Sequence, residues 1–367
     1  MRILIAPDKF KSALNARDVA ENIMFGLREI LPDAKIDMVP VADGGEGTAE
    51  VICEARQGSW VKCDAHDPIG REIEARYAHI DGRKLAVMEM SEAAGMRRLR
   101  PNERDVDLAN TFGVGEMILD AAGRGAQKII IGLGGSATND GGFGTARALG
   151  FRFLKQEKEL TESVSQLVKL ARIEKPGSLS LPKIVAAADV RNPLLGENGA
   201  TRIFGPQKGA TADKIAILER ALTKLADVVS KDLKVNYRDE PGAGAAGGLG
   251  FGLLSFCGAV IRPGFDVVAE SVGLESKMKD VDVVITGEGS LDRQTLEGKT
   301  PAGVARLGRK LGKRVFAIVG RASEDRQVRE LFDEVYVLAQ PGMSEKENIA
   351  RAAELLRERA RELAESL

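Results

Sequence analysis

Gly132-Leu-Gly-Gly-Ser-Ala-Thr-Asn-Asp-Gly-Gly-Phe-Gly144 is a glycine-dense stretch in the middle of this chain. It follows the apolar run 129–131, whose isoleucines are typical of a buried parallel strand. It precedes 145–149, a segment with a helix-like composition. A strand that leads through a glycine-rich turn into a helix forms an anion site, because backbone N–H groups and the positive end of the helix dipole face the turn. The order of these segments therefore predicts a phosphate-binding loop.

Polar side chains add to this predicted loop. Ser136, Thr138 and Asn139 are neutral hydrogen-bond donors. Asp140 adds one carboxylate, for which two roles stay open: it faces a metal ion, or it caps the helix. The alternative to a phosphate-binding loop is a tight turn whose glycines only relieve backbone strain.

Two short motifs resemble other nucleotide sites. Residues 132–137 fit the dinucleotide fingerprint G-x-G-x-x-G/A, and Glu157 lies at about the spacing of its ribose-binding carboxylate. The paired glycines 141–142 argue against this fingerprint, because they fall where the helix of that fold already runs. Residues 298–300, Gly-Lys-Thr, resemble the end of a P-loop, but Arg293 stands in place of its leading glycine. Neither motif is sufficient alone.

The composition limits the classes of function. A length of 367 residues suggests about two domains, and 53 Lys and Arg against 54 Asp and Glu predict no nucleic-acid surface. Cys53, Cys63 and Cys257 lack zinc-type spacing, so we expect reduced thiols in the cytoplasm. The chain begins with strand-like residues 2–6 rather than a signal peptide, and no apolar run reaches membrane-spanning length. We expect a cytoplasmic protein that contacts neither nucleic acid nor membrane.

Charged residues follow the first two predicted strands, 3–6 and 36–41. Between these strands, Asn15 is expected to cap a helix that ends near Leu31, before Pro32. In an open α/β sheet, ligands bind beyond the carboxyl ends of the strands. The polar residues in these positions are Asp8, Lys9, Lys11, Ser12, Asp43 and Glu46. We expect them to contact a polar substrate.

Two later predicted strands also lead into charged residues. The strand 183–188 leads into Asp189 and Arg191, and the strand 281–285 leads into Glu288 and Asp292. Carboxylates suit a metal ion, and arginine suits an acidic substrate. We therefore expect part of the site at the ends of these strands.

The middle of the chain has a different pattern. Residues 72–80 and 84–90 alternate around an Asp-Gly pair, which predicts a β-hairpin. The segment 155–180 is polar and less regular, and 212–233 has the periodicity of a long amphipathic helix. The second glycine-rich run, 242–252, either packs a helix tightly against a neighbour or lets backbone approach a ligand.

These patterns predict an α/β protein with two domains. Residues 1–65 plus 265–367 are expected to form a discontinuous Rossmann-like domain with a mostly parallel sheet. Residues 66–264 are expected to form an inserted α/β domain with a mixed sheet that carries the glycine-rich loop.

A series of motifs, in order along the chain, resembles the type-1 glycerate kinases, the bacterial family that phosphorylates glycerate with ATP. The motifs are Ala6-Pro-Asp-Lys-Phe-Lys-Ser12, Val41-Ala-Asp-Gly-Gly-Glu-Gly-Thr48, Ile131 to Gly142, Asp189-Val-Arg-Asn-Pro-Leu194, Phe204-Gly-Pro-Gln-Lys-Gly-Ala210, Pro241 to Gly248 and Ile285-Thr-Gly-Glu-Gly-Ser-Leu-Asp292. The resemblance implies one flavodoxin-like domain, one domain similar to a restriction-endonuclease core, and an active site in the cleft between them. Lys11 and Ala188 depart from the family pattern, which bears on substrate preference rather than on reaction type.

The resemblance also implies ATP and Mg²⁺ as cofactors and glycerate as a small-molecule substrate. Phosphoryl transfer needs positioning and charge neutralisation more than covalent chemistry. We expect the ATP phosphates to bind at Gly134, Gly135, Ser136, Thr138 and Asn139. The metal candidates are Asp189, Glu288 and Asp292.

For the group that orients the acceptor hydroxyl we favour Asp189, with Asp8 and Asp43 as alternatives. Lys9 and Lys11 are expected to bind the carboxylate of glycerate or the migrating phosphoryl group, with Arg191 as a weaker candidate. Ser12, Asp43 and Glu46 complete the expected substrate contacts.

The expected product is 2-phosphoglycerate, with 3-phosphoglycerate as an alternative. A nicotinamide-dependent oxidoreductase of small hydroxy acids is the competing enzyme class, because of the fingerprint at 132–137. A sensor that binds a sugar acid is a further alternative. We expect a monomer or a homodimer.

Overall fold

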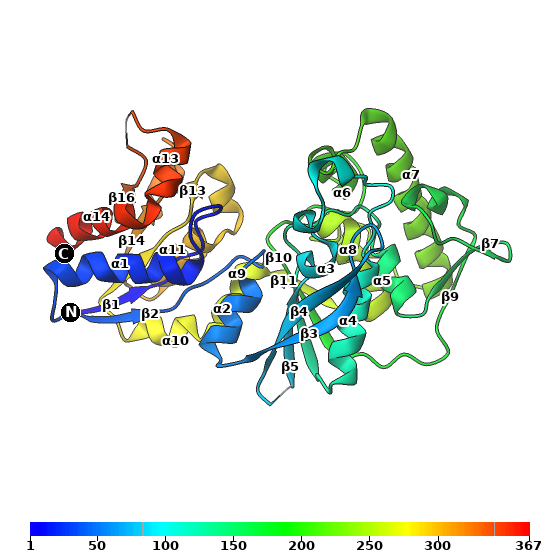
Figure 1. Cartoon of the computed structure of the whole chain (residues 1–367), viewed down its shortest axis with the longest axis horizontal. Coiled ribbons are helices and arrows are strands. Elements are labelled where there is room, and N and C mark those ends of the chain that lie inside the picture. The colour runs from blue at the N-terminus through cyan, green and yellow to red at the C-terminus, as the bar shows by residue number, and fades with distance from the viewer. Residues whose placement is uncertain (83, 341) are drawn as a thin grey trace. The chain divides into compact units, whose positions relative to one another are not determined.

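The computed structural model describes residues 1–82, 84–340 and 342–367. The chain folds into two compact units (Figure 1). Unit 1 comprises Met1–Asp43, Glu50–Arg56 and Pro263–Leu367, and unit 2 comprises Gly44–Ala49 and Gln57–Arg262. The predicted domain bounds remain a prediction, and they differ from these units at three segments. Residues 44–49 and 57–65, assigned above to the first domain, lie in unit 2, and residues 263–264, assigned to the second domain, lie in unit 1.

Unit 1 is built on a five-stranded parallel sheet (Figure 1). Its strands are β1 (Arg2–Ile5), β2 (Lys35–Met38), β12 (Val283–Thr286), β14 (Arg314–Val319) and β16 (Glu334–Val337). The spatial order is β2-β1-β12-β14-β16. Counted within the unit this is 2-1-3-4-5, the flavodoxin order, in which the direction of winding reverses between the first and third strands. The expected flavodoxin-like sheet is confirmed.

Helices cover this sheet. They are α1 (Ala16–Ile30), α2 (Thr48–Ala55), which begins in unit 2, α9 (Gly264–Val272), α10 (Leu274–Lys279), α11 (Thr300–Lys310), α12 (Arg326–Arg329), α13 (Glu345–Ala350) and α14 (Ala352–Glu365), and the short elements are β13 (Ser290–Leu291), η5 (Arg293–Glu297) and β15 (Arg321–Ala322). The predicted cap of α1 is confirmed, because the Asn15 side chain accepts a hydrogen bond from the Asp18 N–H. Apolar residues of β1, β12, α1 and α14 form one buried core.

Unit 2 contains a six-stranded sheet in the order β11-β10-β6-β5-β4-β3 (Figure 1). Its strands are β3 (Ser59–His66), β4 (Glu72–Ile80), β5 (Leu85–Glu89), β6 (Lys128–Gly132), β10 (Lys183–Ala188) and β11 (Val260–Pro263). Strands β5, β6 and β10 are parallel, whereas β3 and β4 are antiparallel to their neighbours. The expected mixed sheet is therefore confirmed, as is the hairpin around Asp81 and Gly82, both of which have positive φ.

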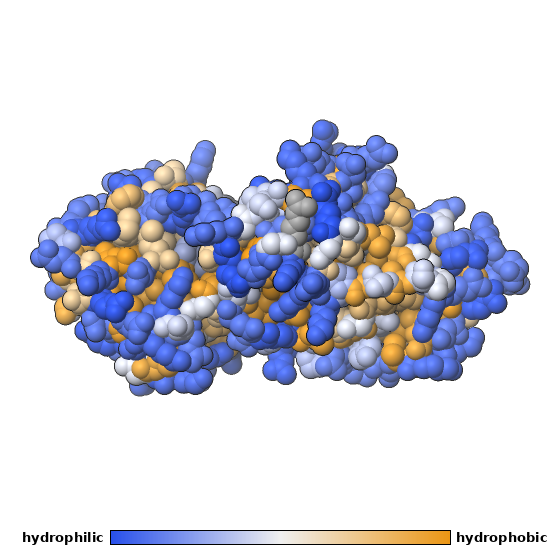
Figure 2. All heavy atoms as spheres, turned by 90° about the horizontal axis from the view of Figure 1, so that it is seen from below, coloured by the Kyte–Doolittle hydropathy of each residue, from blue (hydrophilic) through white to orange (hydrophobic). Residues whose placement is uncertain are grey.

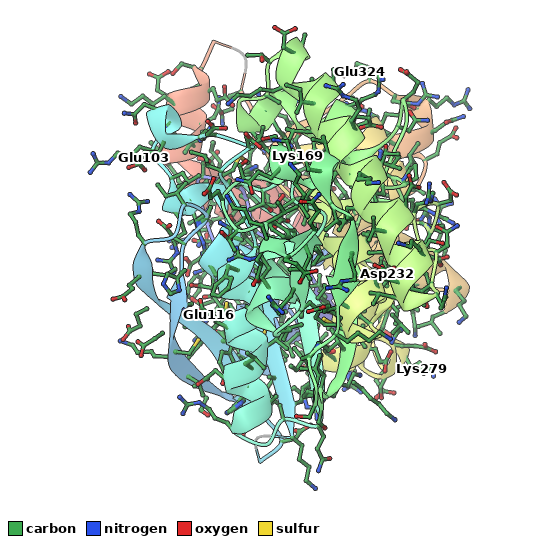
Figure 3. The ribbon with its side chains drawn as sticks, turned by 90° about the vertical axis from the view of Figure 1, so that its right-hand side faces the viewer. Glu103, Glu116, Lys169, Asp232, Lys279 and Glu324 are labelled. Atoms are coloured by element: carbon green, nitrogen blue, oxygen red, sulfur yellow. The ribbon has the colours of Figure 1, made fainter. Side chains whose placement is uncertain are left out.

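The helices of unit 2 surround this sheet. They are α3 (Ser91–Ala94), α4 (Phe112–Gly123), α5 (Phe143–Ala148), α6 (Ala200–Phe204), α7 (Ala212–Leu233) and α8 (Ala245–Cys257), with single 3-10 turns η1 (Met96–Arg98), η2 (Pro101–Glu103), η3 (Val164–Lys169) and η4 (Pro206–Lys208). Figure 3 labels Glu116 on α4, whose carboxylate accepts a 2.7 Å hydrogen bond from the His66 N–H. This bond ties α4 to the end of β3.

The segment 155–180 is more ordered than its polar composition indicated. It contributes to a small antiparallel sheet of β7 (Arg152–Lys155), β8 (Lys158–Glu159) and β9 (Arg172–Glu174). Leu160, Leu167 and Leu170 are buried in the core of the unit, and Asp232 of α7 accepts a 2.8 Å hydrogen bond from the Ile173 N–H (Figure 3). These leucines anchor the segment to the core, whereas most of its other residues are half-buried or exposed.

Hydrophilic side chains cover most of each unit on the face shown in Figure 2. Among the helices of the described residues, none combines the length and apolar character needed to cross a bilayer.

Candidate active site

The glycine-rich loop leaves the sheet of unit 2 between two neighbouring strands. Gly132 ends β6, and its register partners are Glu89 on β5 and Ala187 on β10. Helix α5 then begins at Phe143. Strand, loop and helix thus follow in the predicted order.

Asp140 holds the second half of this loop in place. Its buried carboxylate accepts hydrogen bonds from the Thr111 N–H and hydroxyl, at 2.9 and 2.8 Å, and from the N–H groups of Gly142 and Gly144, at 3.0 and 2.9 Å. Burial raises the pKa of Asp140, and these hydrogen bonds act against that rise. Of the two roles left open by the sequence, the geometry favours the cap, because the carboxylate is occupied by donors at the start of α5.

The second glycine-rich run packs directly against the first. A Cβ on Gly247 would lie 1.9 Å from the backbone oxygen of Thr138, and the Gly141 N–H donates to the Gly247 oxygen at 3.0 Å. Gly247 also has a φ of +67°, which favours glycine. Of the two roles considered for residues 242–252, close packing is therefore observed. Residues 242–252 thereby support the glycine-rich loop.

Several buried polar atoms near this loop have no hydrogen-bond partner. They are Thr138 Oγ1, Asn139 Oδ1 and Ser91 Oγ. The Asn139 amide donates to the Thr201 hydroxyl at 2.9 Å, which orients its oxygen. Because buried polar groups are nearly always hydrogen-bonded, these atoms indicate a site that a polar ligand completes.

Lys208 is a residue of this region that the sequence reasoning missed. Its ammonium is buried and donates to Ser136 Oγ at 2.6 Å and to the Thr138 backbone oxygen at 2.7 Å. Burial lowers the pKa of Lys208 to about 7, and the charge of Asp140 opposes this shift. Lys208 lies in the motif 204–210, but no periodicity of the sequence signals that this lysine reaches a loop some 70 residues earlier.

Two glutamates also lie at the start of the loop. A Cβ on Gly135 would lie 2.7 Å from Glu46 Oε1, so the predicted substrate residue Glu46 is next to a predicted phosphate residue. Glu89, which the sequence reasoning did not select, accepts hydrogen bonds from the N–H groups of Gly47 and Ala49 at 2.8 and 3.1 Å. Glu89 thereby fixes the segment that carries Glu46.

Asp189 and Arg191 follow β10, as predicted, and both are exposed. They leave the same edge of the sheet as the glycine-rich loop, because β10 and β6 are parallel neighbours.

In unit 1, Asp8 and Glu288 lie where the order of the sheet reverses. Asp8 follows β1, Glu288 follows β12, and the Asp8 N–H donates to the Gly287 oxygen at 2.8 Å. Ligands of open α/β sheets bind at such switch points, beyond the carboxyl ends of the strands. The fold therefore places two predicted site residues where a ligand of a flavodoxin-like sheet is expected.

Asp8 is a buried carboxylate with an altered acidity. It accepts hydrogen bonds from the Lys9 N–H at 2.6 Å and from the Thr300 hydroxyl at 2.7 Å. Burial and the charge of Asp43 raise the pKa of Asp8 to about 6, although Lys9 and Thr300 act against the rise. A carboxylate with a pKa near neutrality can accept a proton under physiological conditions.

Thr300 is the first residue of α11, whose N-cap is Lys299. A threonine at the start of a helix often caps the helix with its hydroxyl. The Thr300 hydroxyl instead donates to Asp8.

Glu288 and Asp292 lie on either side of a lysine ammonium. The Lys299 Nζ is 3.9 Å from Glu288 Oε2 and 3.8 Å from Asp292 Oδ1, and Thr295 donates to Glu288 at 2.9 Å. Burial raises the pKa of Glu288 to about 7, and the charge of Lys299 opposes this change. These two metal candidates are in unit 1, whereas the third, Asp189, is in unit 2.

The donor set at Glu288 and Asp292 fits Mg²⁺ in kind. The described residues contain no cluster of three or more potential metal ligands. Mg²⁺, however, needs only one or two carboxylates when phosphates complete its shell. A cation, the Lys299 ammonium, already lies between these two carboxylates.

The remaining predicted residues of unit 1 differ in exposure. Lys9 is half-buried beside Asp8, and Asp43 is half-buried and close enough to raise the pKa of Asp8. Lys11 and Ser12 are exposed, and Ser12 has a φ of +67°, an uncommon conformation for a residue with a side chain.

The dinucleotide fingerprint is not supported. In that motif the helix starts within the fingerprint, whereas here α5 starts at Phe143, well beyond Ala137. Glu157, the expected ribose contact, lies by β7 in the small separate sheet, and its side chain is 93% exposed. Residues 132–137 therefore match the sequence of the dinucleotide fingerprint but not its structure.

A flavodoxin-order sheet with carboxylates at its switch point, together with a strand, a glycine-rich loop and a helix in sequence, is typical of α/β proteins that bind nucleotides or other phosphorylated ligands. Comparison with known proteins narrows this class. The sequence model of the glycerate kinase family matches residues 3–367, so the chain belongs to the glycerate kinase family, whose members are ATP-dependent phosphotransferases acting on an alcohol group. The nicotinamide-dependent oxidoreductase considered from the sequence is thus overturned.

Named relatives match over nearly their whole length. Glycerate kinase of Bacillus subtilis is 40% identical, with 100% of this chain and 98% of the relative covered. Glycerate 2-kinase of Escherichia coli is 43% identical, with 89% of this chain and 86% of the relative covered. A crystal structure assigned as glycerate kinase 2 from Salmonella typhimurium has a TM-score of 0.88 at 40% identity, and the match covers 100% of this chain and 98% of that one.

Proposed function

We propose that this protein transfers the γ-phosphoryl group of ATP to a hydroxyl of D-glycerate and releases 2-phosphoglycerate and ADP. The family membership supports ATP as the donor, and the glycerate 2-kinase among the relatives favours oxygen 2 as the acceptor. The observation that carries the proposal is the loop after β6, whose buried Thr138 hydroxyl and Asn139 side-chain oxygen have no hydrogen-bond partner among the described residues. A phosphorylated ligand with bound waters or ions would supply the missing partners.

The ATP phosphates bind at Gly134, Gly135, Ser136, Thr138 and Asn139. Gly134 packs against the segment that carries Glu46, because a Cβ there would lie 2.5 Å from the Gly45 Cα, so only glycine fits at this position of the loop. The loop is fixed at both ends, by the Ala137 N–H on the Ala94 oxygen and by Asp140. A fixed set of donors costs little reorganisation when charge develops on the phosphoryl group.

Asp8 is the group that orients the acceptor hydroxyl and takes its proton. Its pKa of about 6 leaves it mostly ionised at neutral pH and still able to bind a proton. Asp189, which the sequence favoured, is exposed at the end of β10, and its carboxylate then contacts the metal or the substrate. Asp43 keeps the pKa of Asp8 high.

Glycerate carries a carboxylate and needs cations. Lys9, which lies next to Asp8 in the chain, and Lys11 bind that carboxylate or the migrating phosphoryl group. Ser12, Glu46 and Arg191 complete the substrate contacts.

Glu288 and Asp292 would hold Mg²⁺, with Asp189 as the further candidate. The ion would supply positive charge that neutralises the phosphates. The Lys299 ammonium lies 3.9 Å from Glu288 Oε2 and 3.8 Å from Asp292 Oδ1 and would add a second positive charge at this place.

The proposal is tested by coupling ADP release to D-glycerate in the presence of MgATP. Phosphorus NMR of the product separates 2-phosphoglycerate from 3-phosphoglycerate. Steady ADP release that requires D-glycerate supports the kinase. Tight binding of glycerate without turnover would instead favour the sensor considered from the sequence, and the kinase proposal would then be abandoned.

The oligomeric state and location are also proposals. We propose a monomer or homodimer, which sedimentation equilibrium distinguishes. We propose a cytoplasmic location, supported by Cys53, Cys63 and Cys257, which form no disulfide.

A further inference from the structure

We infer that Lys208 is the cation that binds a nucleotide phosphate in the glycine-rich loop: the fold buries its ammonium against Ser136 and Thr138 without a counter-ion, and the phosphate supplies the missing anion. This inference rests on the proposed function only in taking a nucleotide as the ligand. It adds to the loop a charged residue that the sequence reasoning assigned to no role.

The absence of a counter-ion is the first argument. Both hydrogen-bond partners of the Lys208 ammonium are neutral oxygens, Ser136 Oγ and the Thr138 backbone oxygen. Within the described part of the chain, no carboxylate forms an ion pair with it, and Asp140 acts on it only through space. Charged groups are rarely buried unless they are paired, so an isolated ammonium here indicates that an anion binds beside it.

The Lys208 ammonium and the Ser136 hydroxyl keep hydrogen-bond donors for a ligand. A lysine ammonium has three donors, and only two contacts are formed. Because an ammonium cannot accept, Ser136 Oγ is the acceptor in this contact, and its own O–H can still donate to a ligand. Lys208 and Ser136 together therefore offer two donors at one place.

The unpartnered atoms of the same loop are the third argument. Thr138 contacts Lys208 through its backbone oxygen, while its buried hydroxyl has no partner. The next residue, Asn139, has a buried side-chain oxygen without a partner. A phosphate would accept from the ammonium and from the Thr138 hydroxyl, and a water on that phosphate would donate to the Asn139 oxygen.

The local structure holds the lysine in this position. Lys208 ends η4, its N–H donates to the Gly205 oxygen at 3.0 Å, and Gly209 follows with a φ of +92°. A Cβ on Gly205 would lie 2.3 Å from the Thr201 oxygen, which keeps η4 against α6. The pKa of about 7 agrees with this picture, because an ammonium that lacks an anion is poorly stabilised in a buried site.

The test compares Lys208→Met, Lys208→Arg and a control, Lys214→Met, in the full chain. Lys214 lies on α7 and pairs with Asp105 at 2.7 Å, away from the loop contacts described above. For each variant we measure the affinity for ADP by titration calorimetry, the KM for ATP and for D-glycerate, and the urea midpoint of unfolding. Lys208→Met isosterically removes the charge and keeps most of the buried volume.

The expected result is a loss of ADP affinity of about 100-fold in Lys208→Met, a similar rise in the KM for ATP, and little change in the KM for glycerate. The urea midpoint stays the same or rises, because a buried unpaired charge has been removed. Lys208→Arg recovers part of the affinity, and Lys214→Met behaves as the wild type.

Unchanged ADP affinity in Lys208→Met would overturn the inference, and so would a lower urea midpoint with affinity lost equally for ADP and glycerate, since Lys208 would then only hold the fold. If Lys208→Met does not fold, Lys208→Arg decides: an altered KM for ATP alone supports the inference, and wild-type kinetics overturn it. If the wild type binds ADP through Lys208 but does not phosphorylate glycerate, the proposed function fails and the phosphate-binding role of Lys208 stands.

Discussion

The switch point of unit 1 buries two carboxylates, Asp8 and Glu288, whereas the glycine-rich loop of unit 2 buries an ammonium, Lys208, as well as the carboxylate of Asp140. At the switch point of unit 1, burial raises the pKa of Asp8 to about 6 and that of Glu288 to about 7. In the loop of unit 2, burial lowers the pKa of Lys208 to about 7. In each case desolvation is the largest cause, and the protein compensates it only in part.

This difference indicates a division of tasks. A buried carboxylate with a high pKa is suited to take a proton or to bind a cation, and a buried ammonium with a low pKa is suited to bind an anion. Under the proposed function, the carboxylates of unit 1 serve the acceptor hydroxyl and the metal, and Lys208 of unit 2 serves the phosphates. Because perturbed pKa values collect at functional sites, both regions are candidates for the same reaction on physical grounds.

The largest expected effect is the loss of turnover when Asp8 of unit 1 is replaced. Asp8→Asn removes the proposed proton acceptor, so kcat should fall by about 1,000-fold, with a small change in the KM for ATP. Asp37→Asn, an exposed carboxylate on β2, is the matched control and should not change turnover. Steady-state kinetics measure both variants.

The same assay ranks Asp189 against Asp8. Asp189→Asn should lower kcat far less than Asp8→Asn. A loss of about 1,000-fold in Asp189→Asn with nearly normal turnover in Asp8→Asn would restore the ranking made from the sequence.

The sequence alone predicts several of the strands and helices that position these buried groups. The strand 183–188 and the helix 212–233 were predicted with the observed bounds, because a short apolar run indicates a buried strand and an apolar period of about 3.6 residues indicates a helix. The carboxyl-end rule then places Asp8 and Glu288 correctly beyond their strands.

The missing parts depend on contacts between distant segments. Lys208 meets Ser136 across 72 residues, and Thr300 meets Asp8 across 292 residues. No local pattern of the sequence predicts such pairs, because the residues typical of a turn or a helix start are the same whether or not they contact a distant site. The burial that shifts these pKa values is likewise a property of the assembled core.

The buried groups of the two units should make the free energy of unfolding depend on pH in opposite directions. The folded pKa of Glu288 is above its ordinary value of 4.5, so its contribution is favourable below pH 4.5 and is lost as the pH rises toward 7. Glu288→Gln removes this dependence, and its stability relative to the wild type should rise by about 3 kcal/mol between pH 4.5 and pH 8. Urea midpoints across this range measure it.

Lys208→Met should show the opposite slope. The folded pKa of Lys208 is below its ordinary value of 10.5, so its contribution is complete above pH 10.5 and is lost as the pH falls toward 7. The variant should therefore gain more stability over the wild type at pH 7 than at pH 9. Slopes of the same sign in the two variants would show that the two regions do not bury opposite charges as described.

A smaller effect concerns the metal. Glu288→Gln should raise the Mg²⁺ concentration for half-maximal activity by about tenfold, because the proposed carboxylate ligand is lost. Glu275→Gln, whose carboxylate pairs with Lys279 at 3.2 Å on α10, is the matched control. Chelation of Mg²⁺ should abolish turnover in all variants. An unchanged Mg²⁺ requirement in Glu288→Gln would remove Glu288 from the metal site.

The smallest effect sharpens the assignment of Asp8. Thr300 donates to Asp8 at 2.7 Å and lowers its pKa, so Thr300→Ala should raise the pKa of Asp8 further above about 6. If Asp8 must be ionised for catalysis, activity is lost as the pH falls through this pKa. The acid limb of kcat/KM for glycerate should therefore move to higher pH by less than about one unit.

The control separates this shift from the loss of any buried hydroxyl. Thr286 donates to the Ala6 oxygen at 2.8 Å in the same sheet and does not contact a carboxylate in the described structure. Thr286→Ala should cost stability but leave the acid limb in place, and Thr300→Ser should keep both. An acid limb that stays fixed in Thr300→Ala would mean that a group other than Asp8 accepts the proton. The proton acceptor would then have to be sought among the carboxylates that Thr300 does not touch.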